Sequence, residues 1–258
     1  FEPQIRKIVE EHGMPMPGQS EDGEAGRQTT MFSATFPKEM QDMALDFLDP
    51  GYMWIAVGRV GTVNSNVDQH FVDATQEDKF DALVSALRGA KADDGTIVKS
   101  LVFANTKADV DDVTWRLSDT GIRAAPIHGG LSQSQRDRAI SNLKTGRIQA
   151  LVATDVAARG LDLPGIGHVV NYDLPLNAED YVHRIGRTGR IGNKGRATSM
   201  VGFNEKALKD IVKCLQEGDE ETSPVPEWVE EKAFQSQGRS QHHFGQRRGR
   251  GGDAPSPF

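Results

Sequence analysis

"ALVATDVAARGLD", residues 150–162, joins a short apolar run to a polar segment that contains Asp, Arg and Gly. The run "ALVA" has no polar residue at alternate positions, so a strand formed here is apolar on both faces. Such strands are typical of a parallel sheet that is covered by helices on both sides. We therefore interpret this stretch as a central strand that leads into a polar loop at the ligand-binding edge of the sheet.

The same order of elements recurs along the chain. Strand-like runs lie at 70–74, 100–104, 123–128, 150–154, 168–172 and 197–203. Helix-like segments separate them at 77–89, 107–121, 132–146, 177–186 and 204–216. Strands that alternate with helices of about 10–15 residues predict βαβ units. The expected fold is α/β, with a parallel sheet and helices on both faces.

The N-terminal part of the chain differs from this pattern. Apolar spacing predicts helices at 3–11 and 37–48, and two short β-type runs lie at 28–35 and 53–57. The opening "FEPQIRKIVEEHG" begins in the middle of a helical pattern, so we expect an upstream part of the protein to be missing from this sequence.

Composition excludes several classes of protein. The 258 residues carry a formal net charge of -7 and one cysteine, which excludes an internal disulfide. No apolar run reaches the roughly 20 residues that a transmembrane helix needs, so we expect no membrane association. Any contact with nucleic acid must use a local basic patch, because the chain as a whole is acidic.

Polar clusters directly follow three of the predicted strands. They are "ANTK" (104–107), "HGG" (128–130) and "TDVAARGLD" (154–162). The carboxyl ends of parallel strands meet at one edge of a sheet, so these clusters should form a shared polar rim. Gln133 and Arg136 are three residues apart at the start of a helix and should point to the same side of it.

The segment "YVHRIGRTGR" (181–190) places three arginines and a histidine within ten residues of an acidic chain. Arg184, Arg187 and Arg190 are three residues apart. Glycines among them tend to end a helix, which would present the last two arginines near its C-terminus. A guanidinium grips phosphate oxygens in pairs, and an arginine finger on a transferring phosphoryl group increases the rate by about 10³–10⁵. A basic surface turn is the alternative.

A nucleotide cradle does not accompany these arginines. The pattern G-x-x-x-x-G-K-[ST] does not occur, and there is no "DEAD" segment to hold Mg²⁺. The chain alone is therefore predicted not to hydrolyse ATP.

Five segments, taken in order, resemble the second half of a DEAD-box RNA helicase of superfamily 2. They are "SAT" (33–35), "LVFANTK" (101–107), "HGGLSQSQR" (128–136), "ATDVAARGLD" (153–162) and "HRIGRTGR" (183–190). The last two, about 30 residues apart, are the most specific. One departure is Gly130, where the family often has Asp. "AVGRVG" and the Arg/Gly tail are most similar to the translation-initiation subfamily.

The resemblance implies a RecA-like parallel sheet and a remnant of a first RecA-like domain. Residues 1–60 would be the truncated C-terminal end of that first domain, and 61–68 a linker. Residues 69–216 would form the second RecA-like domain, the helicase C-terminal domain. Residues 217–258 would form a polar, Arg/Gly-containing tail that is largely disordered.

The resemblance also assigns roles to single residues. Arg187 and Arg190 would act as arginine fingers and bind the nucleotide, with His183 coupling ATP to RNA. Asp162 would hold the nucleotide ribose. Ser33 and Thr35 would couple the two domains. The RNA sugar-phosphate backbone would be contacted by Thr106, Gln133, Arg136, Thr154, Arg159 and Gly160.

The function that follows is that of an RNA-dependent ATPase and helicase which unwinds or remodels RNA and ribonucleoprotein. ATP and Mg²⁺ would be held mainly by the missing N-terminal half. RNA would be bound through its backbone and independently of sequence. Translation-initiation proteins are expected partners, and the location is cytoplasmic with shuttling to the nucleus. The alternatives are a non-enzymatic RNA-binding or scaffold module, and a DNA helicase of the same superfamily.

The tail adds a second basic element. Arg247, Arg248 and Arg250 should contribute weak, salt-sensitive RNA affinity, and Phe244 could stack on a base. We interpret His242 and His243 as solvated side chains, and we predict no metal site.

Overall fold

The structure is a computed structural model that describes residues 2–18, 26–33, 35–56, 65–92, 95–190, 192–217 and 225–235. The chain divides into two compact units, Phe1–Thr62 and Val63–Phe258. Residues 61–64 of the expected linker, 61–68, lie outside the described residues, and the first strand of the second unit already begins within the expected linker, at Val67.

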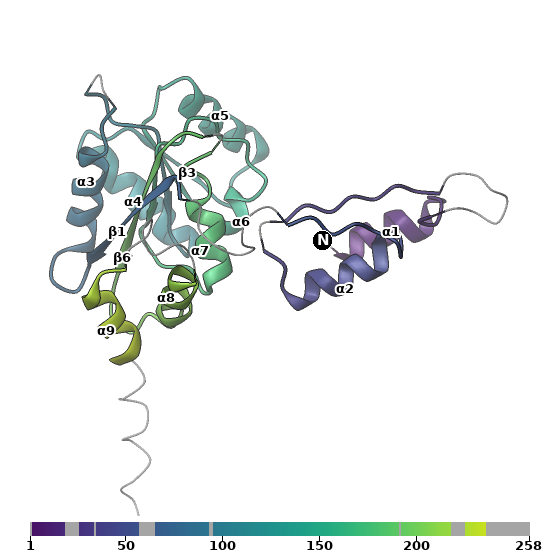
Figure 1. Cartoon of the computed structure of the whole chain (residues 1–258). Coiled ribbons are helices and arrows are strands. Elements are labelled where there is room, and N and C mark those ends of the chain that lie inside the picture. The colour runs from purple at the N-terminus through teal and green to yellow at the C-terminus, as the bar shows by residue number, and fades with distance from the viewer. Residues whose placement is uncertain are drawn as a thin grey trace, which may run out of the picture. The chain divides into compact units, whose positions relative to one another are not determined.

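The second unit is built on a six-stranded sheet in which every pair of neighbours is parallel (Figure 1). The strand order is β1-β6-β5-β2-β4-β3. The strands are β1 (Val67–Asp73), β2 (Ser100–Phe103), β3 (Ala124–Ile127), β4 (Ala150–Ala153), β5 (His168–Asn171) and β6 (Gly195–Val201). All residues of β2, β4 and β5 are buried. This explains their continuous apolar sequences and confirms the predicted fold class.

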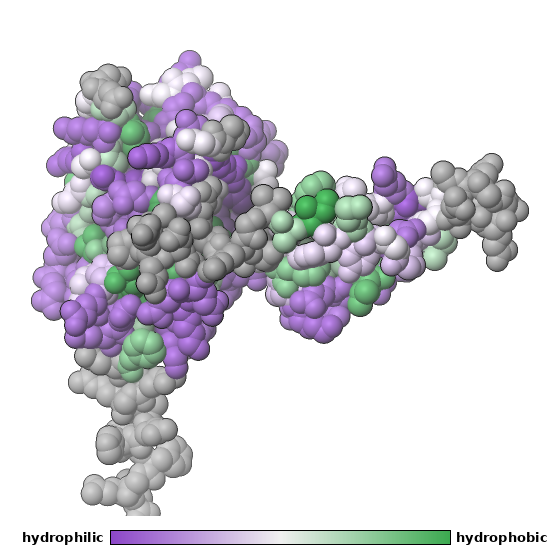
Figure 2. Space-filling view, viewed as in Figure 1, coloured by the Kyte–Doolittle hydropathy of each residue, from purple (hydrophilic) through white to green (hydrophobic). Residues whose placement is uncertain are grey.

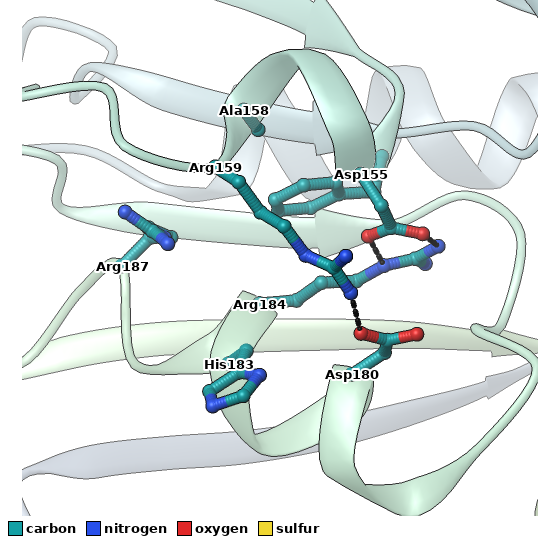
Figure 3. Close-up of a pocket in the computed structure, with 8 residues that line it drawn as sticks. Asp155, Ala158, Arg159, Asp180, His183, Arg184 and Arg187 are labelled. Carbon is teal, nitrogen blue, oxygen red and sulfur yellow. Dashed lines mark hydrogen bonds and ion pairs between the residues drawn. The ribbon is translucent and has the colours of Figure 1, made fainter. Parts of the chain in front are cut away.

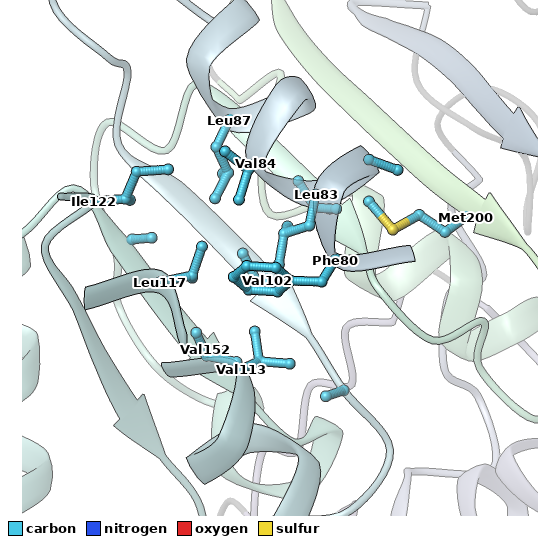
Figure 4. Packing of buried hydrophobic residues seen from close by; sticks show 14 of the residues in the cluster. Phe80, Leu83, Val84, Leu87, Val102, Val113, Leu117, Ile122, Val152 and Met200 are labelled. Atoms are coloured by element: carbon cyan, nitrogen blue, oxygen red, sulfur yellow. The ribbon is translucent and has the colours of Figure 1, made fainter. Parts of the chain in front are cut away.

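Seven helices are described in this unit. They are α3 (Lys79–Gly89), α4 (Lys107–Asp119), α5 (Gln133–Lys144), α6 (Asp155–Ala158), α7 (Ala178–Ile185), α8 (Leu208–Gln216) and α9 (Glu227–Gln235). On one face of the sheet, α3 and α4 enclose a core around Val102 and Val152 (Figure 4). On the other face, α5 and α6 pack on Leu101 and Leu151, and α7 and α8 pack on Ala197.

Local sequence signals fix where these helices begin. Asp78 caps α3, and its side chain accepts hydrogen bonds from the backbone amides of Phe80 and Asp81. Ser132 and Gln135 form a complete capping box at the start of α5. Helices α4 and α5 start a few residues beyond the carboxyl ends of β2 and β3, so their first residues lie at the carboxyl edge of the sheet.

The last described helix was not expected from the sequence. Residues 227–235 fall within the region that we expected to be tail, but they form α9, which packs on α8. Val229 and Ala233 are completely or almost completely buried there. Lys232 pairs with Asp73 at the end of β1, which ties the helix to the sheet. The rest of the tail, 236–258, lies outside the described residues.

The first unit contains α1 (Glu2–Glu11) and α2 (Lys38–Phe47), linked by an ion pair between Arg6 and Asp46 at 2.6 Å. The β-type runs at 28–35 and 53–57 were expected to be strands, but none of their described residues forms a strand. A strand needs a hydrogen-bonded neighbour, and composition alone does not supply one.

Apolar side chains of the first unit are largely exposed (Figure 2). Phe32 is 91% exposed, Met53 81% and Ile55 73%. Helix α1 buries none of its residues. An apolar surface this open is unusual for a folded unit.

Candidate functional site

The residues predicted to contact RNA follow three adjacent strands. Thr106 comes after β2, Gln133 and Arg136 begin the helix after β3, and the Thr154–Gly160 segment follows β4. Since β2, β4 and β3 are neighbours in the sheet, all three segments lie at its carboxyl edge. The structure thus brings together the polar rim that the sequence predicts.

A small pocket opens beside this rim, between the β4–α6 segment and α7 (Figure 3). Its lining is polar and carries both signs of charge. The residues are Phe103, Asp155, Ala158, Arg159, Asp180, His183, Arg184 and Arg187. Two of the three arginines of segment 181–190, Arg184 and Arg187, therefore line the pocket, and they differ in burial and in hydrogen bonding.

Arg184 is buried at the back of the pocket and makes five hydrogen bonds. Its Nε and Nη2 bind the two carboxylate oxygens of Asp155 at 2.5 and 2.6 Å. Nη2 also donates to the side-chain oxygen of Asn105 at 3.0 Å. Nη1 donates to the carbonyl of Asp173 at 2.6 Å and to the side-chain oxygen of Asn171 at 3.4 Å. A guanidinium has five N–H donors, so none is left for a ligand.

Arg187, one turn further on, is half-buried, and its guanidinium makes no hydrogen bond or ion pair with any described residue. Burial lowers the pKa of its guanidinium, and the nearby positive charges of Arg190 and Arg159 lower it further. Its positive charge is therefore poorly compensated. An anion placed beside it would relieve that cost.

Arg190, the third arginine, is exposed and does not line the pocket. Its Nε donates to the carbonyl of Gly186 at 2.8 Å, at the C-terminus of α7. The three equally spaced arginines thus have different environments. All hydrogen-bond donors of the Arg184 side chain are used, the charge of Arg187 has no partner among the described residues, and Arg190 binds the end of its own helix.

Arg159 forms an ion pair with Asp180, which lies in the first turn of α7 (Figure 3). The side chain of His183 lines the same pocket, and its imidazole has no hydrogen-bond partner among the described residues. The pocket therefore contains the ion pair between Arg159 and Asp180, the imidazole of His183 and the guanidinium of Arg187.

The helix-start residues are only partly engaged within the protein. Thr106 caps α4, and its hydroxyl also donates to Asp109 at 2.5 Å. Gln133 donates to Asp137 at 2.8 Å and accepts from Arg136 at 3.4 Å. The Nε of Arg136 is buried and has no partner among the described residues. A buried donor without a partner is energetically costly, and a move of the side chain towards an acceptor would relieve that cost.

The segment after β4 is open at its surface. Thr154 caps α6 without using its side chain. Gly160 has φ +72°, a conformation that favours glycine, and no atom lies within 4 Å of where a Cβ would be. Asp162 is not brought into the pocket, because its carboxylate is 88% exposed and faces Lys144 at 3.6 Å.

The turn after Arg187 is tightly packed. Thr188 is buried and donates to the carbonyl of Ile166 at 2.6 Å. Gly189 has φ +67°, and a Cβ there would lie 2.7 Å from Val67. A Cβ on Gly195 would lie 2.2 Å from the hydroxyl of Thr188. Both glycines are required for this turn, and it fixes the backbone next to Arg187.

The neighbouring "HGG" loop is shaped by a buried histidine. His128 contacts Asp111 at 3.0 Å through Nε2, and its Nδ1 accepts from the amide of Gly130 at 3.1 Å. A Cβ at position 130 would lie 3.0 Å from the imidazole. Glycine at position 130 therefore allows the backbone to lie close to the imidazole.

Other predicted positions lie apart from this pocket or outside the described residues. Ser33 and Thr35 belong to the first unit, where the amide of Thr35 donates to the hydroxyl of Ser33 at 3.3 Å. The tail positions, among them the two histidines and the Arg/Gly run, are outside the described residues. Within the described ranges, no group of three or more His, Cys, Asp or Glu is placed to hold a metal ion. Nor does any helix found there have the length and apolarity to cross a bilayer.

Sequence reasoning missed the residues that hold Arg184. Asn105, Asp155 and Asp173 are ordinary loop residues in the sequence, although each follows directly or closely the end of a strand. Their position just after the end of a strand was the sequence signal that could have identified them.

Comparisons with known proteins agree with this fold. The family described as helicase conserved C-terminal domain matches residues 78–192. A DEAD box protein from the hyperthermophile Methanococcus jannaschii is 39% identical over 72% of this chain and 48% of its own chain, with a TM-score of 0.55. This chain thus spans about half the length of that protein.

Two further structures are similar. Escherichia coli DEAD-box protein SrmB, bound to regulator of ribonuclease activity A, is 34% identical over 62% of this chain and 91% of its own, with a TM-score of 0.52. A Saccharomyces cerevisiae Dbp5 variant, bound to RNA and ADP BeF3, is 31% identical over 84% of this chain and 56% of its own, with a TM-score of 0.64.

Proposed function

The chain belongs to the DEAD-box helicase family, and on this premise we propose that it is the C-terminal portion of an ATP-dependent RNA helicase. In this role the second unit supplies a basic side chain to the phosphates of ATP and a polar edge to the RNA backbone. ATP would supply the phosphoryl group whose transfer to water drives remodelling of RNA.

The observation that carries the proposal is the contrast between Arg184 and Arg187. The two arginines lie one turn apart on the same segment, but the charge of Arg184 is paired with Asp155, whereas the guanidinium of Arg187 has no carboxylate partner among the described residues. An arginine of this kind fits a phosphate. Arg187 would act as the arginine finger, and Arg190 would join it by leaving its contact with Gly186.

The residues present also fit the rest of a nucleotide. Asp162, with its exposed carboxylate, is free to accept from a ribose hydroxyl once it leaves Lys144. His183 lies beside Arg187 in the pocket and would hold a proton or a hydrogen bond between the nucleotide and RNA sides. Ser33 and Thr35 would couple the first unit to these events.

The RNA surface is proposed to be the rim formed by Thr106, Thr154 and Gly160 together with Gln133 and Arg136. Its hydroxyls, its open backbone and the unpartnered Nε of Arg136 suit the phosphate and sugar groups of a strand. Arg159 would join this surface by exchanging Asp180 for a phosphate. None of these groups reads base edges, so binding would be independent of sequence.

We extend the proposal to the translation-initiation subfamily, to partners that act in initiation, and to a cytoplasmic location with nuclear shuttling. Support comes from "AVGRVG" and the Arg/Gly tail in the sequence. The second candidate function is a non-enzymatic RNA-binding module, which is favoured by the lack of a P-loop sequence in this chain.

The test is RNA-stimulated ATP hydrolysis, measured on this chain alone and after adding a separately produced N-terminal half of a related DEAD-box protein. The proposal predicts no activity alone and activity on mixing. Arg187→Ala should reduce that activity by about 10³-fold or more. Arg123→Ala is the matched control, because this exposed arginine lies at the amino end of β3, at the opposite edge of the sheet.

Equal loss with both arginine variants would contradict the assigned role of Arg187. RNA binding without activity in the mixture, with the two halves shown to associate, would favour the RNA-binding module. Activity of the chain alone would contradict the prediction that it lacks a nucleotide cradle.

A further inference from the structure

The buried guanidinium of Arg184 joins three segments that are far apart in the sequence. It binds Asn105 in the β2–α4 loop, Asp155 at the start of α6, and the carbonyl of Asp173 after β5. All five of its donors are used, and its charge also lies 4.9 Å from the ring of Phe103. The side chain is 2% exposed, so no ligand can reach it.

Two of its partners are sequence neighbours of the proposed RNA contacts. Asn105 immediately precedes Thr106, and Asp155 immediately follows Thr154. The backbone of Arg184 acts as well, since its carbonyl accepts from the amide of Arg187 at 3.0 Å. One residue therefore touches the neighbours of two RNA-facing threonines and the backbone of the arginine finger.

We infer that Arg184 is a positioning residue that sets Thr106 and Thr154 at the spacing an RNA strand requires. The inference rests on the proposed function, because it needs the two threonines to contact RNA. It assigns Arg184 no contact with RNA or nucleotide.

The shape of the guanidinium is essential to this role. Its planar fork reaches both oxygens of Asp155 and, on the other side, the Asp173 carbonyl and the Asn105 amide oxygen. An ammonium group has three donors on a single atom and cannot reach all of these acceptors at once. Arg184→Lys thus keeps the charge and removes the geometry.

Asn105 is anchored from several sides, which makes it a sensitive second probe. Its amide nitrogen donates to the carbonyl of Leu174 at 3.0 Å, and its backbone amide donates to Asp173 at 2.9 Å. Asn105→Ala removes the side-chain contacts and leaves the ion pair between Arg184 and Asp155 in place. This variant tests the inference even where Arg184→Lys does not fold.

The experiment uses the whole 258-residue chain and a labelled single-stranded RNA, with affinity measured by fluorescence anisotropy at a temperature where each variant is fully folded. Leu117→Ala is the matched control, because it opens a cavity in the core behind α4 and destabilises without touching the rim. We expect Arg184→Lys and Asn105→Ala to weaken RNA binding at least tenfold. Leu117→Ala should change it less than twofold despite a lowered Tm.

Backbone hydrogen exchange gives a readout that does not depend on RNA. In Arg184→Lys, exchange should increase together at Asn105–Thr106 and Thr154–Gly160, while α3 stays as in the wild type. In the Leu117→Ala control, increased exchange should concentrate in α4.

The inference would be overturned if Arg184→Lys and Asn105→Ala both bound RNA with wild-type affinity. It would also be overturned if the Leu117→Ala control lost as much RNA affinity as these two variants. If the wild-type chain binds no RNA, the proposed function fails on its own. Exchange then decides whether Arg184 positions the two loops, and an unchanged pattern in Arg184→Lys would refute that role.

Discussion

Thr188 provides a quantitative test of how the site holds Arg187 in place. Its hydroxyl is buried and donates to the carbonyl of Ile166 at 2.6 Å. Thr188→Val keeps the shape but leaves that carbonyl buried without a donor, which costs about 1–3 kcal/mol. Thr188→Ser keeps the hydrogen bond and loses one methyl group, which costs about 0.8 kcal/mol.

The wild type should therefore be the most stable protein, Thr188→Ser less stable and Thr188→Val the least stable. For a unit of this size, about 1 kcal/mol corresponds to roughly 2–4 °C in Tm, so the Val variant should melt roughly 2–12 °C lower. Urea denaturation and thermal melting followed by circular dichroism measure both effects. A Ser variant that is as unstable as the Val variant would refute the reasoning, because packing of the methyl would then outweigh the hydrogen bond.

Two further predictions concern stability. Val229→Ala should destabilise the second unit by about 1.5–3 kcal/mol, since Val229 is fully buried on the side of α9 that packs on α8. Phe234→Ala, at a side chain of the same helix that is 52% exposed, should have little effect, and equal effects of the two variants would mean that α9 is not docked. Burial lowers the pKa of His168 to about 4, helped by the charges of Arg196 and His70, so the unfolded chain binds the extra proton first. The free energy of unfolding should fall as the pH drops from about 6.5 towards 4, by about 3 kcal/mol in total, and His168→Gln should flatten that part of the pH profile.

The sequence predicted the sheet and the rim well because both depend on short-range patterns. Continuous apolar runs identified β2, β4 and β5, and Ser132 is the type of residue that caps the start of α5. Parallel strands then bring their carboxyl ends together without further information.

Spacing could not distinguish Arg184 from Arg187. Both are arginines at helical positions three residues apart, and their environments depend on which strand ends lie nearby. Asn105 and Asp155 come from separate loops, so the partner set of Arg184 is a long-range property of the fold.

Composition concealed α9. Its Glu, Lys and Gln residues belong to a polar stretch that is typical of disorder, although Val229 and Ala233 are four residues apart and face the same side. Two buried side chains and the pair between Lys232 and Asp73 were enough to dock a short helix.

The exposed apolar side chains of the first unit also bear on how the chain melts. Few of its described side chains are buried, among them Ala44 and Phe47, whereas the second unit has apolar cores on both faces of its sheet. The heat absorbed on unfolding and its change in heat capacity both follow the surface newly exposed to water. A calorimetric scan should show one cooperative peak from the second unit, with the first unit contributing only a sloping baseline. A Tm measured on the whole chain is then a property of Val63–Phe258 alone.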